Sequence, residues 1–167
     1  LAEAMNRSAK VISLVAEEFA GKFGRSYGFF EPYRLDDAEY ALVLIGSTAG
    51  TAKDVVDRLR KEGKKVGLLK LRVFRPFPSQ LVGEALKKIP RIGVADRADG
   101  LNAVSGPLFP EIMAALYLTD SKPEVMNFIY GLGGRETAEE DILAMYESLF
   151  TMTAASSRSP KYIGVRE

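Results

Sequence analysis

The chain has 167 residues, of which 47% are hydrophobic and 27% charged, the balance of an ordinary soluble globular protein. Its formal net charge is +1, and its Lys and Arg are interspersed with Asp and Glu, so the charge pattern does not indicate binding to nucleic acid or to an acidic membrane surface. The absence of Cys and His excludes disulfides, thiolate zinc sites, iron–sulfur ligation and Ser–His or Cys–His catalysis on this chain.

The length predicts one domain that carries a helical arm and a tail. No apolar run approaches the ~20 residues that a membrane-spanning helix needs. The first residue is Leu1, and no signal peptide follows it. The simplest interpretation is a piece of a longer cytoplasmic chain.

Residues 2–23 are predicted to form a long helix, with apolar residues at alternating steps of four and three and Gly24 as its stop. Val11, Leu14 and Val15 widen the apolar face. This width favours packing against two surfaces, one of which belongs to another domain or chain, although a helix that lies on its own core fits the period equally well. Residues 28–33 then form a loop or short edge strand, since Pro32 argues against a central strand.

Residues 38–71 form one βαβ unit, and the loop in it follows the carboxyl end of a strand. The first strand, 39–45, is nearly continuously apolar, as expected of a strand buried on both faces. The loop 46–51 follows, then a helix whose start resembles a capping box from Thr51 to Asp54, and then a second strand over 65–71.

The remaining chain continues the alternation of helices and strands. A stiff turn at 74–78 precedes a helix that Ser79 caps and that stops before Pro90, and a strand over 91–96 leads into a long connection to residue 106. Further elements are predicted as a helix from Pro107 to about 118, a strand at 125–130, a Gly-rich loop at 131–135, and a last helix from the capping box Thr137-x-x-Glu140 to about 150. The segment from 151 is expected to be loose until Tyr162.

This order of elements predicts a three-layer α/β/α domain with a mostly parallel sheet. We divide the chain into an N-terminal helix and connection (1–30), the α/β domain (31–150) and a C-terminal tail (151–167). The loops that follow the strands ending at 45, 96 and 130 are then expected at one edge of the sheet, where open α/β sheets meet ligands and partners.

These loops supply the candidate binding or interface residues, which are Ser47, Thr48, Gly50, Thr51, Asp96, Arg97, Gly133, Gly134 and Arg135. The first loop either places hydroxyls and N–H groups around an anion at a helix N-terminus, without the Lys of a P-loop, or only caps the helix. Asp96, Arg97 and Arg135 either belong to a site or form an Asp–Arg pair that holds the loops. Gly133 and Gly134 allow either a positive φ in a tight turn or a close approach of another group to the backbone.

The aromatic residues beside the prolines, Phe29, Phe30, Phe74 and Phe77, are interpreted as anchors of a core or an interface. No pair of carboxylates stands out as acid and base. Composition and spacing alone therefore indicate an α/β interaction module.

Read in order, several segments resemble the C-terminal part of the alpha subunit of pyruvate:ferredoxin oxidoreductase. The most specific are Arg72-Val-Phe-Arg-Pro-Phe-Pro78 and Gly131-Leu-Gly-Gly-Arg135, and the others are Glu31-Pro-Tyr-Arg34, Asp37-Ala-Glu-Tyr40, Gly46-Ser-Thr-Ala-Gly50, Asp96-Arg97, Gly106-Pro-Leu-Phe109 and Tyr162-Ile-Gly-Val-Arg166. The resemblance covers essentially the whole chain. It departs from the family at Glu136, where the family usually has Asp.

The resemblance implies the fold of transketolase C-terminal domains, with a five-stranded mixed sheet whose antiparallel edge strand comes from 33–35. It also implies an enzyme that oxidatively decarboxylates a 2-oxoacid to acyl-CoA and reduces ferredoxin, using thiamine diphosphate, magnesium, coenzyme A and iron–sulfur clusters on other domains or subunits. This chain is then expected to bind no cofactor and to hold no catalytic residue. It packs against the rest of the alpha subunit and against the beta, gamma and delta subunits, with its three loops facing these partners.

Two other functions stay open: a stand-alone phosphate- or nucleotide-binding protein that uses the loop at Ser47 and Thr48, and an assembly scaffold without an enzyme. Within the family, we favour pyruvate over 2-oxoglutarate, 2-oxoisovalerate and indolepyruvate. The broad apolar face of the first helix predicts that the isolated chain dimerises or aggregates.

Overall fold

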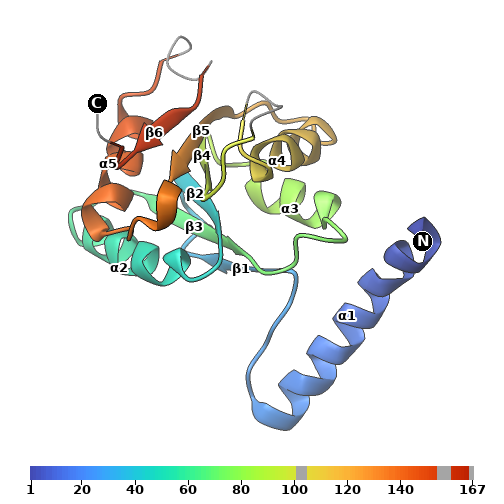
Figure 1. Ribbon diagram of the computed structural model, residues 1–167. Helices are drawn as coiled ribbons and strands as arrows, with labels where there is room; N and C mark the ends of the chain where they lie inside the picture. Colours follow the sequence, from blue (N-terminus) through green and yellow to red (C-terminus); the bar gives the residue numbers. More distant parts are fainter. Residues whose placement is uncertain (101–104, 154–158, 166–167) are drawn as a thin grey trace.

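The centre of the molecule is a six-stranded sheet, seen in the computed structural model of Figure 1, which describes residues 1–100, 105–153 and 159–165. Its strand order is β1-β3-β2-β4-β5-β6, and all neighbouring strands are parallel except β1 and β3. The strands are β1 (Phe30–Tyr33), β2 (Tyr40–Ile45), β3 (Val66–Leu71), β4 (Arg91–Asp96), β5 (Glu124–Tyr130) and β6 (Lys161–Ile163).

The helices of the described chain complete a three-layer α/β/α architecture, which confirms the predicted fold class. Helices α2 and α5 pack on one face of the sheet, and α3 and α4 pack on the other (Figure 1). They are α1 (Ala2–Phe23), α2 (Thr48–Lys61), α3 (Ser79–Leu86), α4 (Leu108–Tyr117), α5 (Glu139–Phe150) and the short 3-10 helix η1 (Leu132–Gly134).

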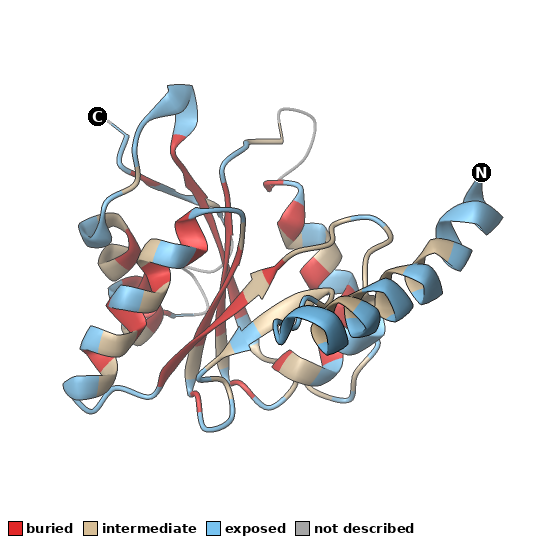
Figure 2. Cartoon of the chain, turned by 90° about the horizontal axis from the view of Figure 1, so that it is seen from below, coloured by how far each residue is buried: buried red, intermediate tan, exposed pale blue. Residues whose placement is uncertain are grey.

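Strand β2 contributes to both cores because its side chains alternate between the two faces. Leu42 and Leu44 pack with α2 and α5, whereas Ala41 and Val43 pack with α3 and α4, and all four are fully buried. The predicted burial of this strand on both faces is confirmed. Figure 2 shows the result as buried strands between two layers of helices with exposed outer faces.

The antiparallel edge strand is β1, which confirms the short edge strand predicted within 28–33 and shares only Tyr33 with the position of 33–35 that the resemblance implied. Arg34 has a φ of +51°, which turns the chain out of the strand direction. Leu35 then packs beneath the sheet beside Gly67, where an added Cβ would lie 2.9 Å from its Cδ2 atom. Pro32 is tolerated within β1 because one side of an edge strand needs no N–H donor.

The sheet has one strand more than the predicted five, because β6 pairs with β5 from Phe128 to Tyr130. Lys161 donates from Nζ to Ser148 Oγ of α5 at 2.8 Å, which holds this strand against the helix layer. The predicted tail therefore contains a strand of the sheet. Residues 154–158 and 166–167 of that segment lie outside the described residues.

Four predicted helix starts differ from the structure, by four residues at α2 and by one residue at α3, α4 and α5. Helix α2 already begins at Thr48, so Thr51 and Asp54 lie inside it and form no capping box. Ser79 is the first helical residue of α3 and follows Pro78 as the N-cap. At α5 the N-cap is Ala138, whose N–H donates to Asp141 Oδ2 at 3.0 Å.

Helix α1 extends along the side of the domain as a separate arm, and none of its residues is buried (Figures 1 and 2). It ends as predicted at Gly24, which has a φ of +66°. None of the helices in the described chain is both long and apolar enough to cross a membrane.

Two helical glycines should respond in opposite directions to alanine. A Cβ at Gly83 of α3 would lie 2.6 Å from the Ala115 carbonyl oxygen of α4, so we expect Gly83→Ala to lower the free energy of unfolding by ~1–3 kcal/mol. Gly50 of α2 has no atom within 4 Å of such a Cβ, so Gly50→Ala should raise it by up to ~1 kcal/mol through helix propensity. Urea denaturation measures both. An unchanged or raised stability of Gly83→Ala would contradict the close packing of α3 on α4, and Gly50→Ala is the control for a helical glycine without such a neighbour.

Candidate functional site

The carboxyl ends of the parallel strands β2, β4 and β5 meet at one edge of the sheet, so the three predicted loops do converge. Tyr130 at the end of β5 lies near residues of the other two loops, and their effect is seen on the pKa of its phenol. Burial raises that pKa, while a side-chain hydrogen bond with Thr48 and the charge of Arg97 lower it. Residues from all three loops therefore lie together, and we call this place the loop edge.

The first loop is shorter than predicted, since only Gly46 and Ser47 separate β2 from α2. Thr48 is 7% exposed and packs inward, and Gly50 donates its N–H to the Ser47 carbonyl oxygen at 2.8 Å within the first turn. Ser47 is exposed and Thr51 half-buried. Thr48 is thus buried within the protein, which weakens the interpretation of this loop as an anion site with three exposed hydroxyls.

Asp96 at the end of β4 fixes the start of α4. Its side chain is 4% exposed, and both carboxylate oxygens accept the N–H of Leu108 at 3.1 Å. Gly106 lies so close that a Cβ there would be 2.4 Å from Asp96 Cβ. The predicted alternative of an Asp96–Arg pair is therefore wrong, because the partner of this carboxylate is a helix N-terminus, where negative charge is favourable.

Burial raises the pKa of Asp96 to about 6, although the N–H groups of Leu108 and Phe109 act in the opposite direction. Loss of solvent is the largest cause of the raised pKa, because Asp96 is only 4% exposed. The carboxyl is thus closer to its charge transition near neutral pH than an ordinary Asp.

The guanidinium of Arg97 packs over the backbone of the third loop. Its Nη2 donates to the Arg135 carbonyl oxygen at 3.2 Å, and a Cβ at Gly131 would lie 2.8 Å from its Nε. The close approach occurs at Gly131, which also has a φ of +62°. Gly133 and Gly134 have positive φ, as a tight turn requires, and no atom of the described residues lies within 4 Å of an added Cβ at either position.

Arg97 and Arg135 are exposed, and neither forms an ion pair with a carboxylate within the described residues. Most other Arg side chains of the domain do form one, for example Arg75 with Glu111 and Arg91 with Glu124. The loop edge thus presents two cationic groups that are available to an outside partner. The middle loop also includes residues 101–104, which lie outside the described residues.

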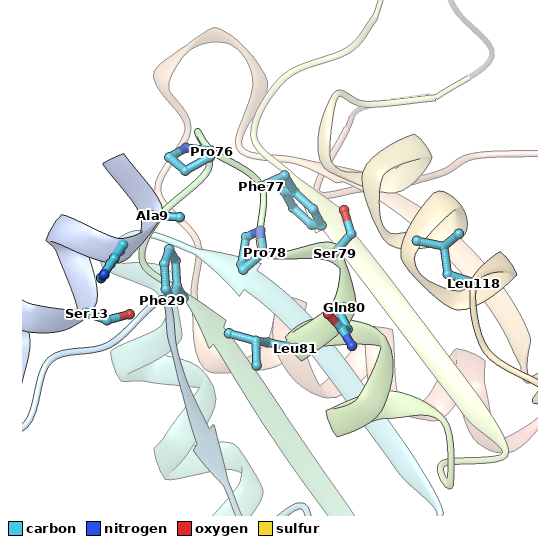
Figure 3. A pocket seen from close by; sticks show the side chains of 11 residues that line it. Ala9, Ser13, Phe29, Pro76, Phe77, Pro78, Ser79, Gln80, Leu81 and Leu118 are labelled. Carbon is cyan, nitrogen blue, oxygen red and sulfur yellow. The ribbon is translucent and has the colours of Figure 1, made fainter. Parts of the chain in front are cut away.

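An apolar groove of about 500 Å³, which the sequence did not predict, lies between α1 and the turn before α3 (Figure 3). It is lined by Ala9, Lys10 and Ser13 of α1, by the aromatic rings of Phe29 and Phe77, and by Pro76, Pro78, Ser79, Gln80, Leu81 and Leu118. Phe30, Phe74 and Phe77 also pack against the core on the α3 and α4 face. The sequence signal for the groove was the position of Phe29 and Phe77 in segments that contain prolines.

Within the described residues, no three His, Cys, Asp or Glu side chains are grouped so that they would hold a metal ion. The only strongly shifted carboxyl at the loop edge, Asp96, is occupied by a helix N-terminus. The described part of the loop edge therefore presents exposed cationic groups that suit the binding of an anionic group.

Comparison with known proteins adds a family and several relatives. Residues 38–142 match the family described as pyruvate:ferredoxin oxidoreductase core domain II. Pyruvate synthase subunit PorA of Thermotoga maritima is 42% identical over 165 residues, which are 99% of this chain and 42% of that protein. Ketoisovalerate oxidoreductase subunit VorA of Pyrococcus horikoshii is 40% identical over 150 residues, which are 89% of this chain and 38% of that protein.

Among solved structures, a split-gene transketolase in an inactive tetramer has a TM-score of 0.51 and 16% identity, over 70% of this chain and 39% of that one. This likeness concerns the fold alone. The chain spans about two-fifths of the length of the curated relatives that it matches.

The buried carboxyl of Asp96 should give folding a distinctive pH dependence. Its pKa in the folded state lies above that of the unfolded chain, so the stabilisation that protonated Asp96 provides is complete below about pH 4 and is lost as the pH rises through about 6. In Asp96→Asn the amide oxygen still accepts from Leu108 but does not titrate. We therefore expect the stability of the variant, relative to the unchanged chain, to increase between pH 4 and 7.

Urea denaturation at half-unit pH steps measures this difference. Asp96→Ala serves as the control, because it leaves the Leu108 N–H without an acceptor and should cost ~1–3 kcal/mol. A stability difference between Asp96→Asn and the unchanged chain that is constant with pH would contradict the buried, raised carboxyl.

Proposed function

The chain belongs to the pyruvate:ferredoxin oxidoreductase core domain II family, and we propose that it acts as this domain within the alpha subunit of a 2-oxoacid:ferredoxin oxidoreductase. In this proposal the whole enzyme decarboxylates a 2-oxoacid oxidatively with thiamine diphosphate, transfers the acyl group to coenzyme A and passes electrons through iron–sulfur clusters to ferredoxin. The chain itself supplies structure and subunit contacts.

One observation supports this role most directly: the side chains at the loop edge either hold the fold or are unpaired cations. Asp96 holds the start of α4 and Thr48 is buried, whereas Arg97 and Arg135 are exposed and have no carboxylate partner among the described residues, although Arg97 also donates to the Arg135 carbonyl oxygen. Such an arrangement attracts and orients an acidic partner surface, because guanidinium groups form short, bidentate hydrogen bonds with carboxylates.

The composition of the chain agrees with cofactors that are held elsewhere. Without Cys it has no thiolate to ligate an iron–sulfur cluster, and its described residues group no metal ligands. We therefore assign no catalytic residue to this chain and place thiamine diphosphate, magnesium, coenzyme A and the clusters on other domains or subunits. The partners in this proposal are the rest of the alpha subunit, the beta, gamma and delta subunits, and ferredoxin through the complex.

Pyruvate is the substrate that we propose for the whole enzyme. Three matching proteins named pyruvate synthase subunit PorA align over 99% of this chain at 41–42% identity, and two further PorA proteins align over 80% and 87%, compared with 89% at 40% identity for the VorA relatives. The contacts that would separate one 2-oxoacid from another lie on other domains in this proposal.

Reversing both charges at the loop edge should impair assembly. We expect Arg97→Glu/Arg135→Glu, introduced into the intact complex, to reduce copurification of the other subunits and 2-oxoacid-dependent ferredoxin reduction at least ~10-fold. The partner's carboxylates would lose their charge-assisted hydrogen bonds with the two guanidinium groups and would be repelled by the new Glu side chains. Both are measured on the affinity-purified complex, with the amount of bound subunits determined by quantitative gel analysis.

Lys88→Glu is the matched control, since this exposed Lys lies after α3 and away from the loop edge. It should leave assembly and activity unchanged. Normal assembly of the double variant would contradict a partner contact at the loop edge.

The phosphate-binding alternative makes a separate prediction on the isolated chain. We expect inorganic phosphate and coenzyme A to cause no saturable shift of its melting temperature. A domain that only packs against proteins binds no small ligand, so no ligand stabilises its folded state. A saturable shift that disappears in the Arg97→Glu/Arg135→Glu variant would instead favour an anion-binding protein.

A further inference from the structure

The two sides of α1 differ in exposure and in residue type. One side is half-buried and composed mainly of small residues, namely Ser8, Ala9, Ile12, Ser13, Ala16, Phe19 and Ala20. Ala9 and Ser13 of this side line the groove between α1 and the domain. On the other side Val11, Leu14 and Val15 are 56%, 54% and 58% exposed. The larger aliphatic side chains thus point away from the protein's own core.

A seam with the spacing of a coiled coil follows this outer side. Its residues recur at alternating steps of three and four, as positions facing a second helix do, and they are Ala4, Arg7, Val11, Leu14, Glu18 and Gly21. The seam is aliphatic in the middle, charged toward both ends and small at its limits. Charged residues at such positions fix the orientation of a helix pair at some cost in affinity.

The seam is complementary to itself when a second copy runs in the opposite direction. A two-fold axis between residues 12 and 13 places Val11 of one copy against Leu14 of the other, and Arg7 against Glu18. The same axis places Ala4 against Gly21, two small residues that let the backbones approach. It also brings Glu3 opposite Lys22, so both charged pairs have opposite signs.

We propose that α1 is a homodimerisation helix that pairs antiparallel with α1 of a second copy of this chain. Within one copy Arg7 lies 4.0 Å from Glu3, and Lys22 lies 2.6 Å from Glu18. In the antiparallel pair, the Glu3–Arg7 ion pair of one copy lies beside the Glu18–Lys22 ion pair of the other copy at each end of the seam. The four charges there alternate in sign. A parallel pair would set Arg7 against Arg7 and Glu18 against Glu18, which disfavours that orientation.

This inference goes beyond the proposed function and does not depend on it. It concerns contact between copies of the chain, whereas the loop edge is proposed to contact other subunits. The two proposals can therefore fail separately, because one is tested on the chain alone and the other on the assembled complex.

Sedimentation of the chain over a concentration series tests the dimer. We expect a monomer–dimer equilibrium that Leu14→Glu weakens at least ~10-fold, because it places a charge at the centre of the seam. Tyr117→Glu is the control: Tyr117 is a large, 89% exposed side chain on α4, and changing it should leave the equilibrium unchanged. Circular dichroism verifies that each variant is folded.

A charge exchange then tests the direction of the helices. Arg7→Glu and Glu18→Arg should each weaken the dimer, and the double variant should restore it, since its two reversed charges again face each other in an antiparallel pair. In a parallel pair the double variant would still oppose like charges and would not recover. Rescue thus separates the proposed geometry from nonspecific association of apolar surfaces.

Disulfide formation gives a second, independent readout, because the chain has no Cys of its own. The variant Ala4→Cys/Gly21→Cys should form covalent dimers under mild oxidation, while Ala4→Cys alone should not. Along one helix these positions are about 25 Å apart, too far for a bond within one copy. A monomer at all concentrations, a dimer that is insensitive to the α1 variants, or a dimer that lacks charge rescue would overturn the proposal.

Discussion

The parallel pairing of β2 with β3 on one side and β4 on the other is the constraint on which the rest of the structure depends. A strand that is bonded on both sides and packed on both faces has no freedom in register, because a shift by one residue would move Leu42 and Leu44 into the opposite core. This register fixes where β2 and β4 end. It thereby decides which side chains can meet at the loop edge.

Asp96 transmits that constraint from the sheet to a helix. As the last residue of β4 it lies where the strand leaves the core, and its buried carboxylate holds the first N–H of α4. Burial alone would make this charge costly, but the helix N-terminus offsets part of the cost. Gly106 is required at this point, since any larger residue would overlap the Asp96 side chain. The polar group thus fixes the fold at the place where partners are proposed to bind.

The alternation of apolar strands and amphipathic helices was enough to predict the layers, the parallel sheet and the convergence of three loops. Errors occurred where the outcome depends on contacts across the fold. Thr48 resembles a loop hydroxyl in sequence, but its neighbour in space is Tyr130, which is distant along the chain. The sixth strand was missed because β6 has only three residues and depends on β5 and Ser148 for its position. Likewise, Asp96 beside Arg97 suggested an ion pair, whereas the helix N-terminus that binds Asp96 becomes its neighbour only after folding.

The two proposed contact surfaces differ in the physical origin of their affinity. At the loop edge Arg97 and Arg135 attract a partner over a distance, and added salt screens such exposed charges beyond about 8–10 Å. The α1 seam has its aliphatic residues at the centre and its charges at the ends, so burial of apolar area supplies most of the attraction and the charges select the orientation. The first surface therefore suits rapid, oriented recognition of an acidic partner, and the second suits a contact that persists at high ionic strength. In these two proposals one domain organises two different kinds of neighbour at once.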